Sequence, residues 1–169
     1  MAPSPRIAFV GATSGHFASY VSMLRLQRLN PWLAPSLRCF SIAQPVEALV
    51  AQLKQFSPDV IATYPTAAAM LASEAAHGHL RIALREVWTG GETLGRAMRE
   101  QIGRQLGCAV RNSYGASEFL AMGWECASGN MHLNADWVIL EPVDRHHQPV
   151  PPGKTAHTVL LTNLANHVQ

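Results

Sequence analysis

Hydrophobic residues in the first two thirds of the chain alternate between short continuous runs and stretches with helical spacing. The runs have the length of buried strands and occupy residues 7–10, 37–42, 59–63, 86–88 and 109–112. Apolar positions recur at helical intervals within residues 17–29, 46–53, 65–76 and 94–106. This alternation predicts an α/β fold of three layers, with a mostly parallel sheet flanked by helices.

After about residue 117 the pattern becomes irregular. Short apolar segments, separated by Gly, Asn and Pro, occupy residues 119–124, 131–133, 137–140 and 157–162. The stretch 144–154 contains three prolines and Gly153, which predicts an exposed loop. We therefore expect a parallel α/β core over residues 1–118 and an irregular, β-rich tail of the same domain over residues 119–169.

Composition narrows the class of protein. A chain of 169 residues with 48% hydrophobic residues is expected to form one compact domain, or one with a small appendage, and is not intrinsically disordered. The formal net charge of +2 gives no argument for nucleic acid or membrane binding. Only 14% of the residues are charged, below the usual ~25%, so the surface is unusually neutral or is normally covered by protein. Three cysteines without a C-x-x-C pair, and no signal peptide or long apolar span, predict a reduced, cytoplasmic protein.

The first candidate site is the glycine-rich turn 11–15. It follows a strand and precedes a helix, so its backbone N–H groups are placed to hold an anion. Its spacing matches neither the dinucleotide-binding pattern nor the P-loop, and no lysine follows. An ordinary strand-to-helix turn is the favoured interpretation, and phosphate binding remains the alternative.

Two further polar segments also follow strands. Thr89-Gly-Gly-Glu92 removes side chains where a flat ligand approaches the backbone. Asn112-Ser-Tyr-Gly-Ala-Ser-Glu118 combines an amide, an aromatic ring, a glycine, a hydroxyl and a carboxylate, which suit a base, a phosphate and Mg²⁺. Each segment alone is also compatible with a polar surface turn. Ligands of open α/β sheets bind beyond the carboxyl ends of strands, and both segments follow strands there.

These segments resemble the acyl-adenylate-forming ligases, and the phenylacetate–CoA ligase branch in particular. Residues 112–118 are similar to the family's Tyr-Gly-x-Thr/Ser-Glu motif, and residues 89–92 to its glycine-containing adenine loop. The tail from Gln148 to Leu164 resembles the family's proline–glycine turn and following apolar strand, and Glu125-Cys126 with Met131-His132-Leu133 is a run typical of the branch.

The resemblance implies that a carboxylic acid attacks ATP, that an acyl-adenylate forms, and that the acyl group passes to a thiol, usually that of coenzyme A. It implies Mg²⁺ held by Glu118, with Ser117 near the α-phosphate. The implied nucleotide-binding residues are Gly90, Gly91, Glu92, Asn112, Ser113, Tyr114 and Gly115. The implied acyl-pocket residues are His16, Phe17, Tyr64 and Pro65.

The chain also departs from the family pattern. The lysine-containing phosphate loop and the domain with the catalytic lysine have no counterpart in the sequence. We therefore expect a central fragment of a larger enzyme, inactive by itself, that forms a homodimer through apolar surface. A non-catalytic α/β module that binds a nucleotide or a protein is the main alternative. A small Rossmann-like oxidoreductase is disfavoured, because G-x-G-x-x-G is absent.

Cys126 and His132 also suggest a zinc site. Two ligands fall short of the usual four, and neither Cys39 nor Cys108 has a spacing that would complete the set. A buried thiol and an ordinary histidine are the favoured interpretation.

Overall fold

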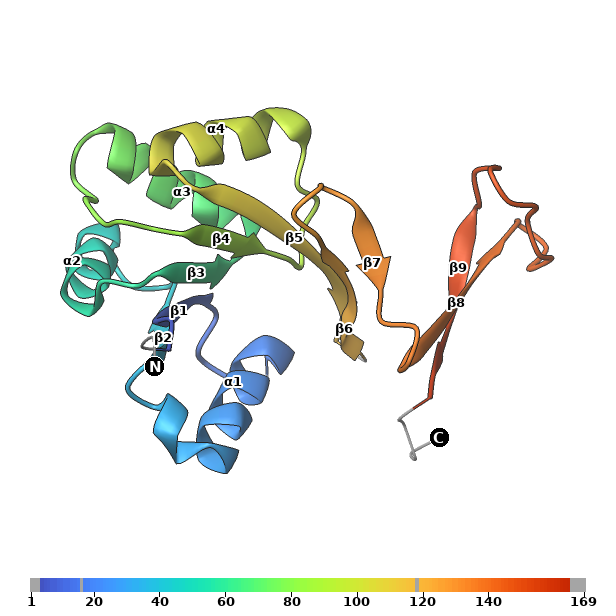
Figure 1. Ribbon diagram of the computed structural model, residues 1–169, viewed down its shortest axis with the longest axis horizontal. Helices are drawn as coiled ribbons and strands as arrows, with labels where there is room; N and C mark the ends of the chain where they lie inside the picture. Colours follow the sequence, from blue (N-terminus) through green and yellow to red (C-terminus); the bar gives the residue numbers. More distant parts are fainter. Residues whose placement is uncertain (1–3, 16, 118, 165–169) are drawn as a thin grey trace.

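The chain folds around a seven-stranded sheet with the strand order β2-β1-β3-β4-β5-β6-β7 (Figure 1). The computed structural model describes residues 4–15, 17–117 and 119–164. The strands of this sheet are β1 (Ile7–Gly11), β2 (Leu37–Ser41), β3 (Val60–Thr63), β4 (Glu86–Thr89), β5 (Ala109–Ala116), β6 (Phe119–Glu125) and β7 (Met131–Leu133). Strands β1 to β5 pair in parallel, which confirms the predicted mostly parallel sheet.

Helices cover both faces of the parallel strands. They are α1 (Ala18–Leu29), the short 3-10 helix η1 (Pro31–Leu33), α2 (Val46–Phe56), α3 (Pro65–Ala76) and α4 (Arg96–Leu106). The chain moves from β1 to β2 in one direction and from β3 to β5 in the other. Right-handed crossovers therefore place α1 on one face and α2, α3 and α4 on the other, as Figure 1 shows. No helix in the described part of the chain is long and apolar enough to cross a membrane.

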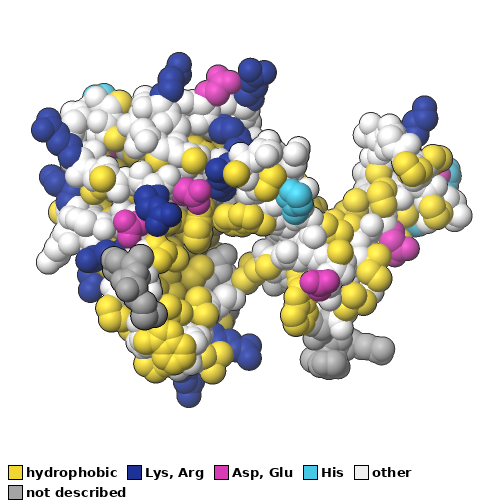
Figure 2. Space-filling view, viewed as in Figure 1, with side chains coloured by type: hydrophobic (Ala, Val, Ile, Leu, Met, Phe, Trp, Pro, Cys, Tyr) yellow, Lys and Arg dark blue, Asp and Glu magenta, His cyan; other side chains and the backbone are white. Residues whose placement is uncertain are grey.

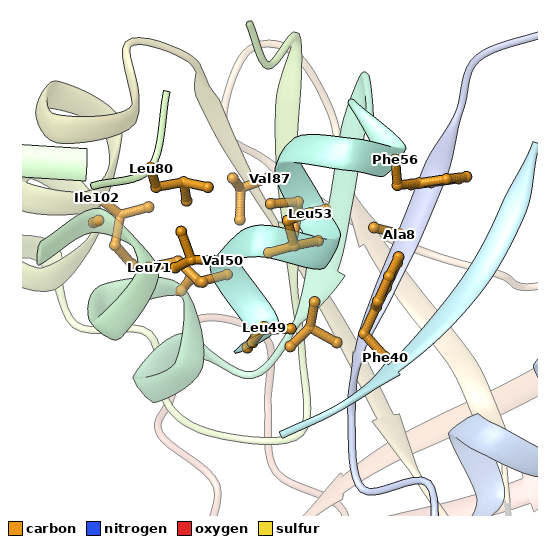
Figure 3. Close-up of a cluster of buried hydrophobic side chains, with 14 of the residues drawn as sticks. Ala8, Phe40, Leu49, Val50, Leu53, Phe56, Leu71, Leu80, Val87 and Ile102 are labelled. Carbon is orange, nitrogen blue, oxygen red and sulfur yellow. The ribbon is translucent and has the colours of Figure 1, made fainter. Parts of the chain in front are cut away.

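The hydrophobic core lies between the sheet and helices α2, α3 and α4. Alternate residues of the strands, such as Ala8 and Val87, point to this face and pack against Leu53, Leu71 and Ile102 of the helices (Figure 3). By contrast, α1 has no buried residue. The two faces of the sheet are therefore covered to different degrees, and the face under α1 retains open space.

Two elements differ from the sequence-based expectation. Residues 113–116, which follow the predicted strand 109–112, also belong to β5, because β6 folds back beside them and supplies antiparallel hydrogen-bonding partners. The β-rich tail divides: β6 and β7 extend the main sheet, whereas β8 (Val138–Val143) and β9 (Thr158–Asn163) form a separate two-stranded sheet (Figure 1).

Candidate functional site

A cavity of about 440 Å³ lies between α1 and the open face of the sheet. Its lining comes from α1, from β1, β3, β4, β5 and β6, and from the turns that follow β3 and β4. The strand order reverses beside β1, where β1 and β3 leave the sheet in opposite directions. Crevices at such a reversal, beyond the carboxyl ends of the strands, are the usual ligand sites of open α/β sheets.

The cavity has aromatic walls and a floor of small residues. The aromatic lining residues are Phe9, Phe17, Tyr64, Trp88 and Trp124, and the small ones on β4, β5 and the following turns are Gly90, Gly91, Ser113, Gly115, Ala116 and Ser117. Among the described residues that line the cavity, none carries a charge. The cavity therefore suits an apolar group and offers hydroxyls and backbone groups along the edge where the strands end.

Glycine is required at positions 90 and 115, because neighbouring atoms lie too close to leave space for a Cβ atom. A Cβ atom at Gly90 would collide with Oγ of Ser113, and one at Gly115 would collide with the backbone carbonyl oxygen of Leu120. At Gly91 the φ angle is +80°, and the ring of Tyr64 lies 3.4 Å from the position of a Cβ. The glycine turn is thus held against both β5 and Tyr64, with no room for side chains.

Hydrogen bonds fix the polar segment of β5 against β4. The hydroxyl of Thr89 lies 3.0 Å from Oδ1 of Asn112 and 3.1 Å from the carbonyl oxygen of Arg111, both of which are acceptors. The hydroxyl of Ser113 donates to the carbonyl oxygen of Thr89 at 3.0 Å. The two candidate nucleotide-binding segments therefore lie side by side.

A partly buried ion pair supports the same strand from the other face. Glu125, on β6, accepts a hydrogen bond from Nη2 of Arg99 at 2.9 Å and one from the backbone N–H of Asn112 at 2.7 Å. Arg99 also donates to the carbonyl oxygen of Val110 at 2.8 Å. Helix α4, β5 and β6 are thereby joined at the beginning of the polar segment. No local sequence pattern links Glu125 to Arg99, so this role of Glu125 is not predictable from the sequence.

The structure brings together seven of the residues singled out from sequence. The cavity is lined by Phe17, Tyr64, Gly90, Gly91, Ser113, Gly115 and Ser117. His16 and Glu118 lie outside the described residues.

Four others lie outside the cavity wall. Asn112 is held by β4, and Tyr114 alternates with Ser113 along β5, so its exposed ring lies on the opposite face of the strand. Pro65 is buried at the start of α3. Glu92 accepts hydrogen bonds of 3.0 Å from both the backbone N–H and the hydroxyl of Thr66, at the N-terminus of α3.

The sequence analysis missed the aromatic residues Phe9, Trp88 and Trp124 as wall residues. The sequence pattern that could have identified them is the alternation of side chains along a strand, in which every second residue faces the same side of the sheet. Trp88 stands two positions before Gly90 and therefore faces the same side. In a continuous apolar run every position is hydrophobic, so the sequence does not show which residues face the helices and which face the cavity.

Cys126 and His132 lie near each other at the end of the β6–β7 hairpin. Hydrogen bonds from the backbone N–H of Asn130, from the His132 side chain and from the backbone N–H of Ser128 lower the pKa of the Cys126 thiol to about 7. Burial raises the pKa of Cys108 to about 11. No group of three or more His, Cys, Asp and Glu side chains able to hold a metal ion occurs within residues 4–15, 17–117 and 119–164.

Comparison with known proteins yields matches to solved structures. No family model and no curated protein matches the chain. A 2-hydroxyisobutyryl-CoA ligase in complex with 2-HIB-AMP and CoA aligns with 96% of this chain and 36% of its own, at 20% identity and a TM-score of 0.77. The anthranilate CoA ligase AuaEII in complex with anthranoyl-AMP aligns with 95% of this chain and 32% of its own, at 16% identity and a TM-score of 0.67.

A benzoate CoA ligase from Burkholderia xenovorans gives 18% identity and a TM-score of 0.66 over 96% of this chain and 35% of that one. The chain spans about a third of the length of these structures. Over that length, it has the fold of the acyl-CoA ligases.

Proposed function

We propose that this chain is the nucleotide-binding and acid-binding part of an AMP-forming carboxylic acid–CoA ligase, within the phenylacetate–CoA ligase branch. One observation carries the proposal. The Gly90-Gly91 turn and the Ser113–Ser117 segment border one apolar cavity, at the reversal of strand order, in a chain with the fold of acyl-CoA ligases. The sequence motifs and the geometry therefore point to the same place.

The two reactants would meet at the edge of the sheet where the glycine turn lies beside β5. The acyl group enters the apolar cavity, where Phe17 and Tyr64 contact it, and its carboxylate stays at the edge beside Ser117. The base of ATP lies against the glycine turn and stacks on the exposed ring of Tyr114. The residues proposed to border the nucleotide are Gly90, Gly91, Glu92, Asn112, Ser113, Tyr114 and Gly115. His16 and Pro65 complete the proposed acyl side.

The proposed chemistry has two steps. A carboxylate oxygen of the acid attacks the α-phosphorus of ATP, the bond between the α-phosphorus and the bridging oxygen breaks, and pyrophosphate leaves with the electron pair. The sulfur of coenzyme A then attacks the acyl carbon, a proton leaves the thiol, and AMP departs. The chain's own residues orient both reactants and keep water from the apolar end of the cavity.

Mg²⁺ would neutralise part of the phosphate charge in this reaction. Its proposed ligand is Glu118, a carboxylate of the donor type that Mg²⁺ prefers. Glu118 lies outside the described residues.

We further propose that the chain by itself does not adenylate an acid. The uncharged lining offers no lysine or arginine, among the described residues, to offset charge on the α-phosphate. Loss of one such electrostatic contribution typically costs about 10²–10³ in rate.

We place the protein in the cytoplasm. We also propose that it forms a homodimer through the apolar side chains that Figure 2 shows over α1 and η1.

A stable acyl-adenylate mimic, an acyl-sulfamoyl adenosine, provides the test on the purified chain. We expect measurable binding by calorimetry, and Tyr114→Ala should weaken it about tenfold, since base stacking is worth about 1–3 kcal/mol. Tyr20→Ala, a tyrosine of α1 outside the cavity lining, is the matched control. ATP–pyrophosphate exchange with the chain alone should stay at background, and robust exchange would overturn the inactivity proposal.

Binding of the mimic without exchange is also what a non-catalytic nucleotide-binding module would show. The two differ when a separate protein supplies the lysine-containing parts. A ligase fragment should then regain pyrophosphate exchange, and a non-catalytic module should not. Absence of mimic binding would overturn the nucleotide-binding proposal itself.

A further inference from the structure

The cavity ends at a row of side chains that crosses three strands. Phe9 on β1 pairs with Ala62 on β3, which pairs with Trp88 on β4, so the three side chains lie in one row on the face toward α1. One row closer to the carboxyl ends of the strands stand the small residues Gly90 and Ser113. On β1, β3 and β4 the cavity lining begins at this row and continues toward the carboxyl ends of the strands.

Trp88 is held by two specific contacts. Its indole N–H donates to Oε2 of Glu86 at 2.7 Å. Its ring also meets that of Trp124 edge to face, with centroids 5.3 Å apart and an interplanar angle of 88°. Such an arrangement is favourable for aromatic pairs. The ring is thus fixed by one strong hydrogen bond and one aromatic contact.

Glu86 is itself held by a cation. Its Oε1 lies 3.6 Å from Nε of Arg111, and Arg111 donates to the carbonyl oxygens of Cys126 and Ala127 at 3.1 and 3.2 Å. The support of the Trp88 ring therefore runs from β4 through β5 to the turn after β6. The Trp88 ring would have to break these contacts to make room for a longer ligand.

We propose that Trp88, positioned by Glu86 and Trp124, sets how long an acyl group the cavity admits, and that the cavity takes compact, uncharged acyl groups. The inference rests on the proposed function, in which this cavity holds the acyl group. The uncharged lining supports the second half of the proposal, because a charged tail would lose its hydration without gaining a partner. Glu86 is a positioning residue that acts through the indole N–H.

The test is a binding series on the purified chain, measured by calorimetry with straight-chain carboxylic acids from acetate to decanoate and with the matching primary alcohols. Affinity should rise about fourfold for each methylene group until the chain reaches Trp88, and then stop rising. Trp88→Ala should move this limit outward by at least two methylene groups. The first acid beyond the original limit should then bind roughly fourfold more tightly.

Further variants distinguish a specific effect of Trp88 on the length limit from a general disturbance of the fold. Ala62→Leu fills the space beside Trp88 and should shorten the limit, which is the opposite effect. Glu86→Ala should let affinity keep rising for chains beyond the original length limit. Glu86→Gln keeps an acceptor for the indole N–H and should preserve that limit. Trp137→Ala removes an exposed tryptophan outside the cavity lining and should leave the series unchanged.

The outcomes distinguish this inference from the proposed function. If acids bind but neither Trp88→Ala nor Ala62→Leu changes the limit, the inference is wrong and the proposed function stands. If the alcohols show a chain-length limit that depends on Trp88 while no acid binds, the role of Trp88 is supported and the acid-binding function is wrong. If neither series binds to any variant, both are overturned.

Discussion

The carboxylate of Glu125 on β6 accepts a hydrogen bond of 2.7 Å from the backbone N–H of Asn112 on β5. This contact joins the beginning of the proposed nucleotide-binding segment to a buried anion, because only 7% of the Glu125 side chain is exposed. The anion needs its partner Arg99, which reaches it from α4 at 2.9 Å. The position of Asn112 therefore depends on an ion pair that lies outside the cavity.

Arg99→Ala should strongly destabilise the protein. It leaves the Glu125 carboxylate buried without a cation, which typically costs about 3–5 kcal/mol of the free energy of unfolding. Arg96→Ala, on the same helix, breaks an exposed pair with Glu100 and should cost about 0–1 kcal/mol. Urea unfolding of the two variants measures the difference. Equal costs would show that Glu125 does not depend on Arg99.

Two glycine-to-alanine substitutions should have opposite effects on stability. Gly115→Ala forces the new methyl group into the backbone of Leu120, which cannot give way as a flexible side chain does, and should cost about 1–3 kcal/mol. Gly103→Ala, in the interior of α4, places its methyl group in ordinary contact at 3.4 Å from the carbonyl oxygen of Cys108. It should stabilise the protein by about 0.5–1 kcal/mol. Thermal unfolding of both variants checks the signs, and destabilisation of similar size in both would contradict this account.

The parallel strands were predictable from sequence because their apolar runs are buried on both faces or nearly so, as in Val60 and Ile61. The extension of β5 through Ser113 and Tyr114 was not, because these residues become strand only when β6 supplies a pairing partner. Sequence motifs identified the glycine turn and the segment after it. The aromatic end of the cavity depends on the register between β1, β3 and β4, which no local pattern reveals.

Cys126 should react selectively with iodoacetamide near neutral pH. Its pKa is lowered to about 7, so the reactive thiolate fraction rises with pH and is half-maximal at about pH 7. The pKa of Cys108 is raised to about 11 by burial, and burial also raises that of Cys39, so both thiols should stay protonated there. Mass spectrometry of the alkylated peptides over pH 5–9 gives the profile.

His132→Ala removes one of the groups that favour the Cys126 thiolate and should shift its alkylation profile to higher pH. His157→Ala, on the separate β8–β9 unit, is the matched control and should leave the profile unchanged. A His132→Ala profile identical to that of the unmodified chain would show that the histidine does not act on the thiol.

Glu92 should contribute to stability as well as to the proposed nucleotide site. Its carboxylate accepts two hydrogen bonds of 3.0 Å from Thr66, one from the backbone N–H that would otherwise be unpaired in the first turn of α3. Glu92→Ala should lower the free energy of unfolding by about 0.5–2 kcal/mol, as for the loss of a helix cap. Glu92→Gln keeps an acceptor and should cost less. Glu141→Ala, an exposed glutamate on β8, is the control in urea unfolding. A Glu92→Ala variant of full stability that binds the acyl-adenylate mimic less tightly would assign Glu92 to the ligand alone.

Self-association should depend on the surface of α1 and η1. Leu29 is 65% and Trp32 73% exposed, and Val21 and Leu24 add to the same apolar region. Contiguous apolar patches above a few hundred Å² tend to bind a partner, and a second copy is always present in a purified sample. We therefore expect sedimentation at twice the chain mass of 18.4 kDa.

Charge placed in this region should abolish the association, because an unpaired carboxylate is costly to bury in an apolar interface. Leu29→Glu together with Trp32→Glu should yield a monomer with unchanged circular dichroism. Trp137→Glu places one such charge on an exposed tryptophan beside β8 and should leave the dimer intact. If Trp137→Glu disrupts the dimer and the double variant does not, the interface lies on the two-stranded sheet, and a monomeric unmodified chain would contradict self-association altogether.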